Sequence, residues 1–260
     1  MRTSRTLALA SAIIFALLVI PASAAPLSRT FVSGTGSDSN TCIRTAPCAS
    51  FGGALGKTAT GGEIDCLDPG DFGAVTINKS VSIICDGVSN GGIALSSLGN
   101  AISVDASTSS VVYLSGLDLN GGGAGNFGII VNSPSAAVTV YIVHCTIRGF
   151  ANDGGVGVES PETARVIIKD STIVNNGDGV LVQDQGAANA LLIFNTIIDG
   201  NANYAAYVNG SHSYIALQQT VLSGSPDGLN VMNGGSAELI GPSNTIAGTI
   251  VGSPTSVAFK

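Results

Sequence analysis

A Thr-Ile or Thr-Val step recurs along the second half of the 260-residue chain at nearly constant spacing. Successive steps are 26, 24, 24 and 25 residues apart, and polar turns rich in Asn, Asp and Gly separate them. The steps begin at Thr146, Thr172, Thr196, Thr220 and Thr245. A fixed period of this size indicates a stacked repeat, in which each unit buries its apolar face only against its neighbours.

The residue types within the repeat distinguish two stacked architectures of similar period. A leucine-rich repeat needs leucines at fixed offsets and usually a helical segment. The leading strands here are instead rich in Ile, Val and Ala, and no 3.6-residue periodicity lies inside a repeat. They cover residues 128–131, 155–158, 179–182, 205–208 and 228–231. β-Branched residues on short strands favour an all-β fold, a right-handed parallel β-helix.

Alternation along each strand predicts which side chains face the core. Thr should face outward at every step and the following Ile or Val inward. The residue before each Thr would then form an inward column of small or amide side chains. That column contains Cys145, Ser171, Asn195, Gln219 and Asn244. In this register His144 and Asp170 belong to the next outward column, on adjacent coils.

The first 24 residues have the features of a secretory signal peptide. Arg2 and Arg5 form a basic start, residues 7–20 are uncharged, and small residues at 22–24 follow Pro21. We therefore predict a signal peptide over 1–24 and a secreted or periplasmic protein, with no membrane contact after cleavage. An uncleaved membrane anchor is the alternative reading.

The remaining chain divides into a cap and a solenoid. Phe51, Ala54 and Leu55 have helical spacing, which predicts a short helix covering the first coil. We expect an N-terminal cap over 25–60 and a parallel β-helix of about eight coils over 61–260. The C-terminal coil has no predicted cap, so self-association through its open end is expected.

Cysteine positions agree with an exported chain. Cys42 and Cys48 flank a short polar loop that a disulfide could close. Cys66 and Cys85 would have Cα atoms about 4.8 Å apart if their strands stack on successive coils, a spacing that a disulfide accepts. Two stacked thiols without a bond are the alternative for this pair. Cys145 is predicted to be a buried small hydrophobe, and no spacing resembles a zinc site.

The acidic charge balance limits the class of partner. Without residues 1–24, eight of the ten basic residues remain against 17 acidic ones, so the net charge changes from −7 to −9. Such a surface repels nucleic acid, and no Lys/Arg cluster offsets it. A polyanionic polysaccharide would need bound cations or a few well-placed basic groups.

Several N-terminal segments carry a family resemblance. Residues 30–40, Cys42, the Ala-Pro-Cys sequence at 46–48, and residues 62–70 and 75–81 resemble the cap and first coils of bacterial right-handed parallel β-helix repeat proteins. This is the pectin-lyase-like superfamily. The resemblance implies relatives among carbohydrate-active enzymes, tailspikes and adhesins, and the fold by itself assigns no activity.

The hydrolase motifs of that superfamily are missing. Asn195-Thr196 is followed by Ile197 rather than Asp, there is no adjacent Asp-Asp pair, and His212 does not lie in a Gly-His-Gly turn. Lyase chemistry would need carboxylates around Ca²⁺ and a basic residue to take a proton. No carboxylate cluster can be read from the sequence. We therefore predict no cofactor and leave Ca²⁺ open.

One group of titratable residues remains a candidate catalytic set. The predicted register places His144 beside Asp170, with Arg148 and Lys169 nearby, where they could bind or deprotonate an acidic sugar. An exposed ion pair on a solvated sheet is the alternative.

Two hypotheses about function follow. The favoured one is an exported solenoid that presents a flat sheet to a polysaccharide or cell-surface glycan. The other is a divergent polysaccharide lyase or glycoside hydrolase that acts on acidic polysaccharide. Whether the chain is an enzyme stays open at this point.

Overall fold

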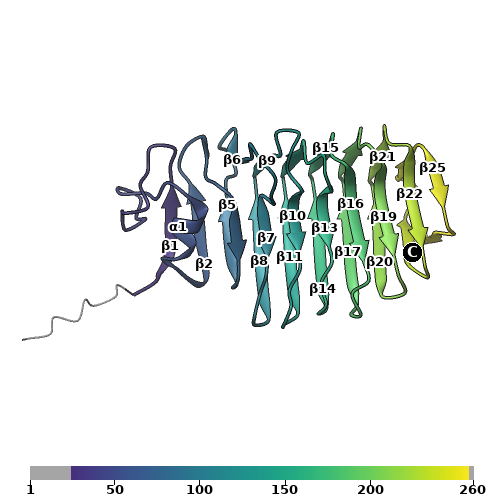
Figure 1. Ribbon diagram of the computed structural model, residues 1–260, viewed down its shortest axis with the longest axis horizontal. Helices are drawn as coiled ribbons and strands as arrows, with labels where there is room; N and C mark the ends of the chain where they lie inside the picture. The colour runs from purple at the N-terminus through teal and green to yellow at the C-terminus, as the bar shows by residue number, and fades with distance from the viewer. Residues whose placement is uncertain (1–24, 258–260) are drawn as a thin grey trace, which may run out of the picture.

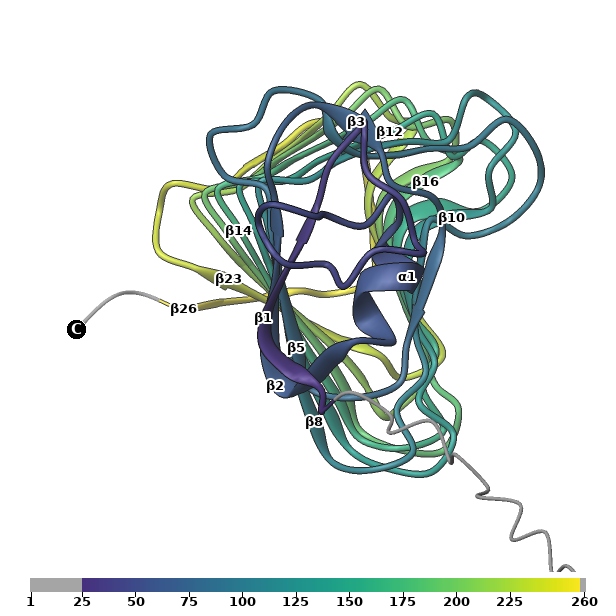
Figure 2. The same ribbon diagram turned by 90° about the vertical axis from the view of Figure 1, so that its left-hand side faces the viewer.

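The computed structural model describes residues 25–257 and shows a right-handed parallel β-helix (Figure 1). The predicted signal peptide at 1–24 lies outside the described residues, as do residues 258–260. Each coil contributes one strand to each of three parallel sheets, which surround a common core in the view along the axis (Figure 2). The predicted fold class is confirmed.

The three sheets are called sheets 1, 2 and 3, in the order in which the chain visits them in each coil. Sheet 1 has ten strands: β1 (Leu27–Val32), β2 (Thr58–Cys66), β5 (Val81–Ile84), β8 (Ser110–Ser115), β11 (Val138–Val143), β14 (Ala164–Lys169), β17 (Asn189–Phe194), β20 (Ser213–Gln218), β23 (Ser236–Ile240) and β26 (Thr255–Val257).

Sheets 2 and 3 have eight strands each. Sheet 2 consists of β3 (Gly70–Asp71), β6 (Gly91–Ala94), β9 (Asp118–Asn120), β12 (Thr146–Arg148), β15 (Thr172–Val174), β18 (Ile197–Asp199), β21 (Val221–Ser223) and β24 (Thr245–Ile246). Sheet 3 consists of β4 (Val75–Ile77), β7 (Ile102–Val104), β10 (Phe127–Val131), β13 (Gly154–Val158), β16 (Asp178–Gln183), β19 (Tyr204–Asn209), β22 (Asp227–Met232) and β25 (Thr249–Val251).

A single core runs along the inside of the coils. In the coil formed by β11, β12 and β13, the side chains of Val140, Ile142, Ile147, Val156 and Val158 are fully buried. The same inward positions in the next coils hold Val, Ile and Leu, so each coil completes the burial of its neighbours. Apolar burial between coils therefore holds the solenoid together.

The register corrects the predicted facing of two threonines. Thr146 pairs with Thr172, but Thr172 pairs with Ile197, one residue past the next Thr-Ile step. Thr196 and Thr220 therefore face inward and are fully buried, while Ile197 is 49% exposed. The prediction that Thr faces outward is correct for Thr146 and Thr172 and wrong for Thr196 and Thr220.

The threonine hydroxyl explains why the Thr-Ile step fits two registers. The Oγ1 of Thr196 donates to the carbonyl of Phe194 at 2.8 Å and accepts from the backbone N–H of Ser171 at 3.4 Å. Its polar atom is thus satisfied inside the coil, where a hydroxyl without partners would be costly. The inward column is therefore formed by Cys145, Ser171, Thr196 and Thr220. Asn195 and Gln219, predicted inward, are exposed instead.

The N-terminal cap contains the predicted short helix. Helix α1 (Phe51–Leu55) begins at the N-cap residue Ser50, whose hydroxyl accepts a hydrogen bond from the N–H of Gly53. The buried side chains of Phe51, Ala54 and Leu55 belong to the core, and the helix packs against β1, β2 and β4. β1 already pairs with β2, so the cap contributes a strand to sheet 1.

Both cysteine pairings that the sequence left open are disulfides. The Cys42–Cys48 bond closes the loop of the cap, with Cα atoms 4.7 Å apart. The Cys66–Cys85 bond joins the first two full coils, with a Cα separation of 4.8 Å. Cys145 is a free, buried cysteine, and its burial raises the pKa of the thiol to about 12. Such a thiol is inert as a nucleophile at neutral pH.

The strands of sheet 3 begin differently from those of sheet 1. Gly155 and Val156 are consecutive, yet both face inward where β13 leaves the preceding bend. A Cβ atom on Gly155 would overlap the Cγ2 of Ile173 and lie 2.7 Å from the carbonyl oxygen of Gly179. Glycine is therefore required by close packing at this position, which explains the Gly-led pattern of the repeat.

No helix within residues 25–257 is long and apolar enough to span a membrane.

Candidate functional site

A column of polar residues follows the bend between sheets 1 and 2. In successive coils this position is occupied by Gly116, His144, Asp170, Asn195 and Gln219, all with positive φ, between 44° and 70°. The left-handed backbone turns the chain sharply from one sheet to the next and directs each side chain outward. The column therefore places several polar groups in a row along the axis.

His144 bridges two carboxylates. Its Nδ1 lies 3.3 Å from Oδ1 of Asp86, and its Nε2 lies 3.7 Å from Oδ2 of Asp170. Gly116 occupies the intervening coil between Asp86 and His144, and a Cβ there would lie 2.5 Å from the backbone nitrogen of Asp86. Because Gly116 has no side chain, the imidazole reaches past one coil to Asp86.

Asp170 is held in its ionised form. The Nδ2 of Asn195 donates to its Oδ1 at 2.6 Å, and the Nζ of Lys169 lies 3.3 Å from its Oδ2. The Asn195 hydrogen bond and the Lys169 and His144 charges hold the pKa of Asp170 below its usual value. A carboxylate stabilised in this way is a weak proton acceptor, but it can accept hydrogen bonds from a ligand.

A shallow groove of about 390 Å³ adjoins this column. Asp170, Asn195 and Gln219 line it from the bend, and Thr172, Ile197 and Val221 line it from sheet 2. The groove is half polar and lies open along the axis.

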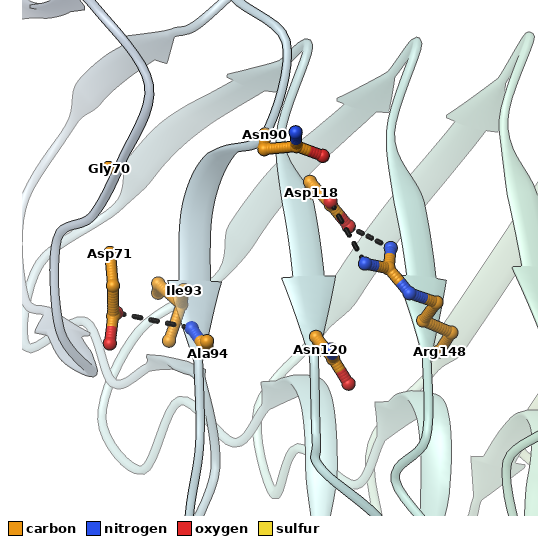
Figure 3. Close-up of a pocket in the computed structure, with 8 residues that line it drawn as sticks. All are labelled: Gly70, Asp71, Asn90, Ile93, Ala94, Asp118, Asn120 and Arg148. Carbon is orange, nitrogen blue, oxygen red and sulfur yellow. Dashed lines mark hydrogen bonds and ion pairs between the residues drawn. The ribbon is translucent and has the colours of Figure 1, made fainter.

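Arg148 does not join the His144 cluster. It lies at the end of β12, where its Nη2 donates to Oδ2 of Asp118 at 3.0 Å and its Nη1 bonds Oδ1 (Figure 3). This pair lines a separate depression of about 200 Å³, together with Asp71 and Asn120. The structure thus brings together His144, Lys169 and Asp170 from the predicted set and places Arg148 elsewhere on sheet 2.

Sequence reasoning missed two members of the cluster. Asp86 lies 58 residues before His144 and touches it only because Gly116 intervenes. Asn195 was expected in the core, because the Thr-Ile step suggested the wrong register. The matching positions of Asp170 and Asn195 would have emerged from aligning whole sheet-1 strands rather than the Thr-Ile steps.

The outer face of sheet 1 carries a continuous apolar strip beside this column. The strip follows one register position through four consecutive coils and consists of Tyr113, Tyr141, Ile167 and Leu192. The rings of Tyr113 and Tyr141 are 6.0 Å apart, and Tyr141 is 37% exposed. Exposed Arg165 and Lys169 flank the strip on β14. Sheet 1 therefore presents a flat face with apolar and basic groups.

Within residues 25–257, no group of three or more His, Cys, Asp or Glu side chains is arranged to hold a metal ion.

Comparisons with known proteins identify the fold class. No family model matches the chain, and no curated protein sequence matches it. Among solved structures, the crystal structure of pectate lyase Pel9A is similar, with a TM-score of 0.51 and 14% sequence identity, over 91% of this chain and 79% of that one. A rhamnogalacturonan lyase aligns with a TM-score of 0.38 and 11% identity, over 88% of this chain and 86% of that one. The chain is thus a pectin-lyase-like parallel β-helix in its fold.

Proposed function

We propose that the outer face of sheet 1 binds a polysaccharide. The observation that carries this proposal is the strip formed by Tyr113, Tyr141, Ile167 and Leu192. Flat aromatic and aliphatic side chains suit the C–H faces of sugar rings, because contact there removes apolar surface from water without deep burial. Since the strip runs along the axis, one polymer chain contacts several coils at once.

Charged groups beside the strip support the same proposal. Arg165, Lys169 and His144 supply hydrogen-bond donors along one side, and Asp170 and Asn195 supply acceptors. These groups suit a glycan with many hydroxyls and isolated carboxylates. A dense polyanion is disfavoured, because the chain carries a net charge of −7.

The alternative function is polysaccharide cleavage at the His144 cluster. The observations that favour it are the groove beside Asp170 and the fold shared with pectate lyase Pel9A. In this hypothesis His144 would take or give the proton, and Lys169 would stabilise an acidic sugar. The ion pairs of Lys169 with Asp170, and of Arg148 with Asp118, leave both cations already partnered. Binding is therefore the better supported of the two.

A single panel experiment separates these functions. Purified protein is passed over insoluble polysaccharides, with retention and the release of unsaturated or reducing ends measured together. Tyr141→Ala is expected to weaken retention about tenfold, the equivalent of ~1.4 kcal/mol, and Tyr141→Phe to preserve it. Ile197→Ala removes a similarly exposed apolar side chain from sheet 2 and is the matched control.

Each outcome has a defined meaning. Retention without cleavage that depends on Tyr141 supports the binding function. Retention that is equal in wild type and Tyr141→Ala contradicts the assignment to sheet 1. Cleavage that His144→Ala abolishes would replace binding by catalysis at the His144 cluster.

A further inference from the structure

The outer face of sheet 3 carries a second, chemically different array. β16, β19 and β22 place six side chains in two adjacent columns, three coils long. The first column contains an acid, a tyrosine and an acid; the second contains a leucine, a tyrosine and an asparagine. This tyrosine platform consists of Asp178, Tyr204, Asp227, Leu181, Tyr207 and Asn230.

The centre of the platform is a pair of stacked rings. Tyr204 and Tyr207 have ring centroids 4.9 Å apart and an interplanar angle of 22°. Tyr207 also packs against Leu181, which belongs with Phe127 and Ile130 to a small apolar cluster outside the main core. The rings are therefore held in place by packing before any ligand arrives.

The polar groups around the rings are mainly acceptors. Asp178 accepts from the Nδ2 of Asn203 at 3.0 Å, and Asp227 accepts from the Nδ2 of Asn230 at 3.1 Å. Asn230 is only 8% exposed, yet its Oδ1 has no hydrogen-bond partner. Its neighbour Leu229 points into the core, so the Asn230 side chain lies on the outer face with the tyrosines. A buried carbonyl oxygen without a partner is costly, and a ligand donor would remove that cost.

The charge of this face has one sign. Within the described residues, the eight strands of sheet 3 contain no Lys, Arg or His. Burial, opposed by its hydrogen bonds and reinforced by Asp153, raises the pKa of Asp178, and burial together with Asp153 raises that of Glu159. These carboxylates therefore lie close enough to repel one another, and no cation of the protein compensates them.

We propose that the tyrosine platform binds a glycan that carries free amino groups. An ammonium group is a donor and a cation, so the carboxylates attract it and the tyrosine rings stabilise it through their π faces. The sugar hydroxyls supply further donors, including one for Asn230. This site is independent of the proposed sheet-1 function, since it lies on another sheet and uses no residue of the strip.

The geometry favours a glycan over a basic peptide. Peptides commonly dock by adding a strand to a free sheet edge or by lying in a groove. β16, β19 and β22 are each paired on both sides, so their edges are occupied. A flat surface with stacked rings and acceptors is better matched to a sugar ring.

The test uses soluble oligomers with the intact protein. Calorimetry would compare a glucosamine oligomer, its N-acetylated counterpart of equal length, and a lysine oligomer. We expect the glucosamine oligomer to bind at least tenfold more tightly than the N-acetylated one. Asp178→Asn and Tyr204→Ala should each weaken binding severalfold or more, whereas Tyr141→Ala on sheet 1 should leave it unchanged.

The controls keep this result separate from the sheet-1 proposal. Asp227→Asn keeps the shape of the side chain and removes one charge, so it tests the site even if Tyr204→Ala unfolds the protein. Equal affinity for both sugar oligomers, or unchanged binding by the two Asp→Asn variants, would overturn the proposal. Tighter binding of the lysine oligomer would overturn it in favour of a basic peptide. Retention on polysaccharide that depends on Tyr141 tests only sheet 1.

Discussion

The outer faces of sheets 1 and 3 are built from the same coil repeat but differ in charge. Sheet 1 exposes Tyr141 next to the cations Arg165 and Lys169, whereas sheet 3 exposes Tyr204 next to Asp178. Inward positions are restricted to small and β-branched side chains by stacking, while outward positions are free of that restriction. A parallel β-helix can therefore hold surfaces of opposite character on one chain without changing its core.

The same difference appears in two acids only eight residues apart. Asp170 lies among donors at the edge of sheet 1, and its pKa is lowered, first by the Asn195 hydrogen bond. Asp178 begins a sheet-3 strand, and its pKa is raised, first by burial. The first acid is stabilised as an anion, and the second is kept as an anion at a cost, which is common where a protein binds a ligand.

The largest expected effect concerns the covalent link, which sheet 1 has and sheet 3 lacks. Replacing both Cys66 and Cys85 by Ala should lower the free energy of unfolding by about 3 kcal/mol, because the bond closes a loop of about 20 residues in the unfolded chain. Urea unfolding of the variant and of wild type measures this difference. Equal midpoints with equal slopes would show that the link contributes nothing.

The second effect tests the entry of the sheet-3 strands. Gly155→Val should destabilise the protein by about 2 kcal/mol, because the new side chain overlaps Ile173 and the backbone of the next coil. Ala190→Val, at a half-exposed outward position of sheet 1, is the matched control and should change stability by no more than about 0.5 kcal/mol. Thermal unfolding of both variants gives the comparison. Similar losses in both would mean that the two sheets tolerate added volume equally.

The smallest effect has opposite signs on the two faces. The folded pKa of Asp170 is depressed, so its stabilising contribution is present above the unfolded pKa and lost as pH falls through the folded one. The folded pKa of Asp178 is raised, so its contribution is present below the unfolded pKa and lost as pH rises through the folded one. At pH 7, Asp170→Asn should therefore lower stability and Asp178→Asn raise it, each by about 0.5 kcal/mol.

Urea unfolding between pH 3 and pH 8 would follow both differences. Each should shrink toward zero at the acidic end, where the carboxyls are protonated in both states. A change of the same sign in the two variants at pH 7 would contradict the contrast between the faces.

The periodic residues determined how much of the fold the sequence could predict. The recurring β-branched strands and the spacing of Cys66 and Cys85 depend on the stacking of coils, so the fold class and the Cα separation of that pair followed directly. The facing of Thr196 could not be predicted, because a threonine hydroxyl is satisfied equally well inside or outside a coil. The extra residue between Thr172 and Ile197 then moved Asn195 from the core to the surface.

The candidate surfaces were harder to predict than the core. β11 reads as Val-Thr-Val-Tyr-Ile-Val, with apolar residues in both inward and outward positions, so Tyr141 could not be separated from core residues by pattern alone. The pairing of Tyr204 with Tyr207 depends on the turn into sheet 3, where two consecutive residues face inward. His144 and Asp170 were placed together correctly, because their spacing of 26 residues is the local period.

Gly116 also has a consequence for how the solenoid unfolds. In a stack of coils, free energy is exchanged mainly between nearest neighbours, so local opening can begin at any boundary and spread outward. By allowing His144 to reach Asp86, Gly116 adds a contact between second neighbours. An opening on either side of the Gly116 coil must then break that contact as well. These three coils should exchange their amide hydrogens as one cooperative unit rather than one coil at a time.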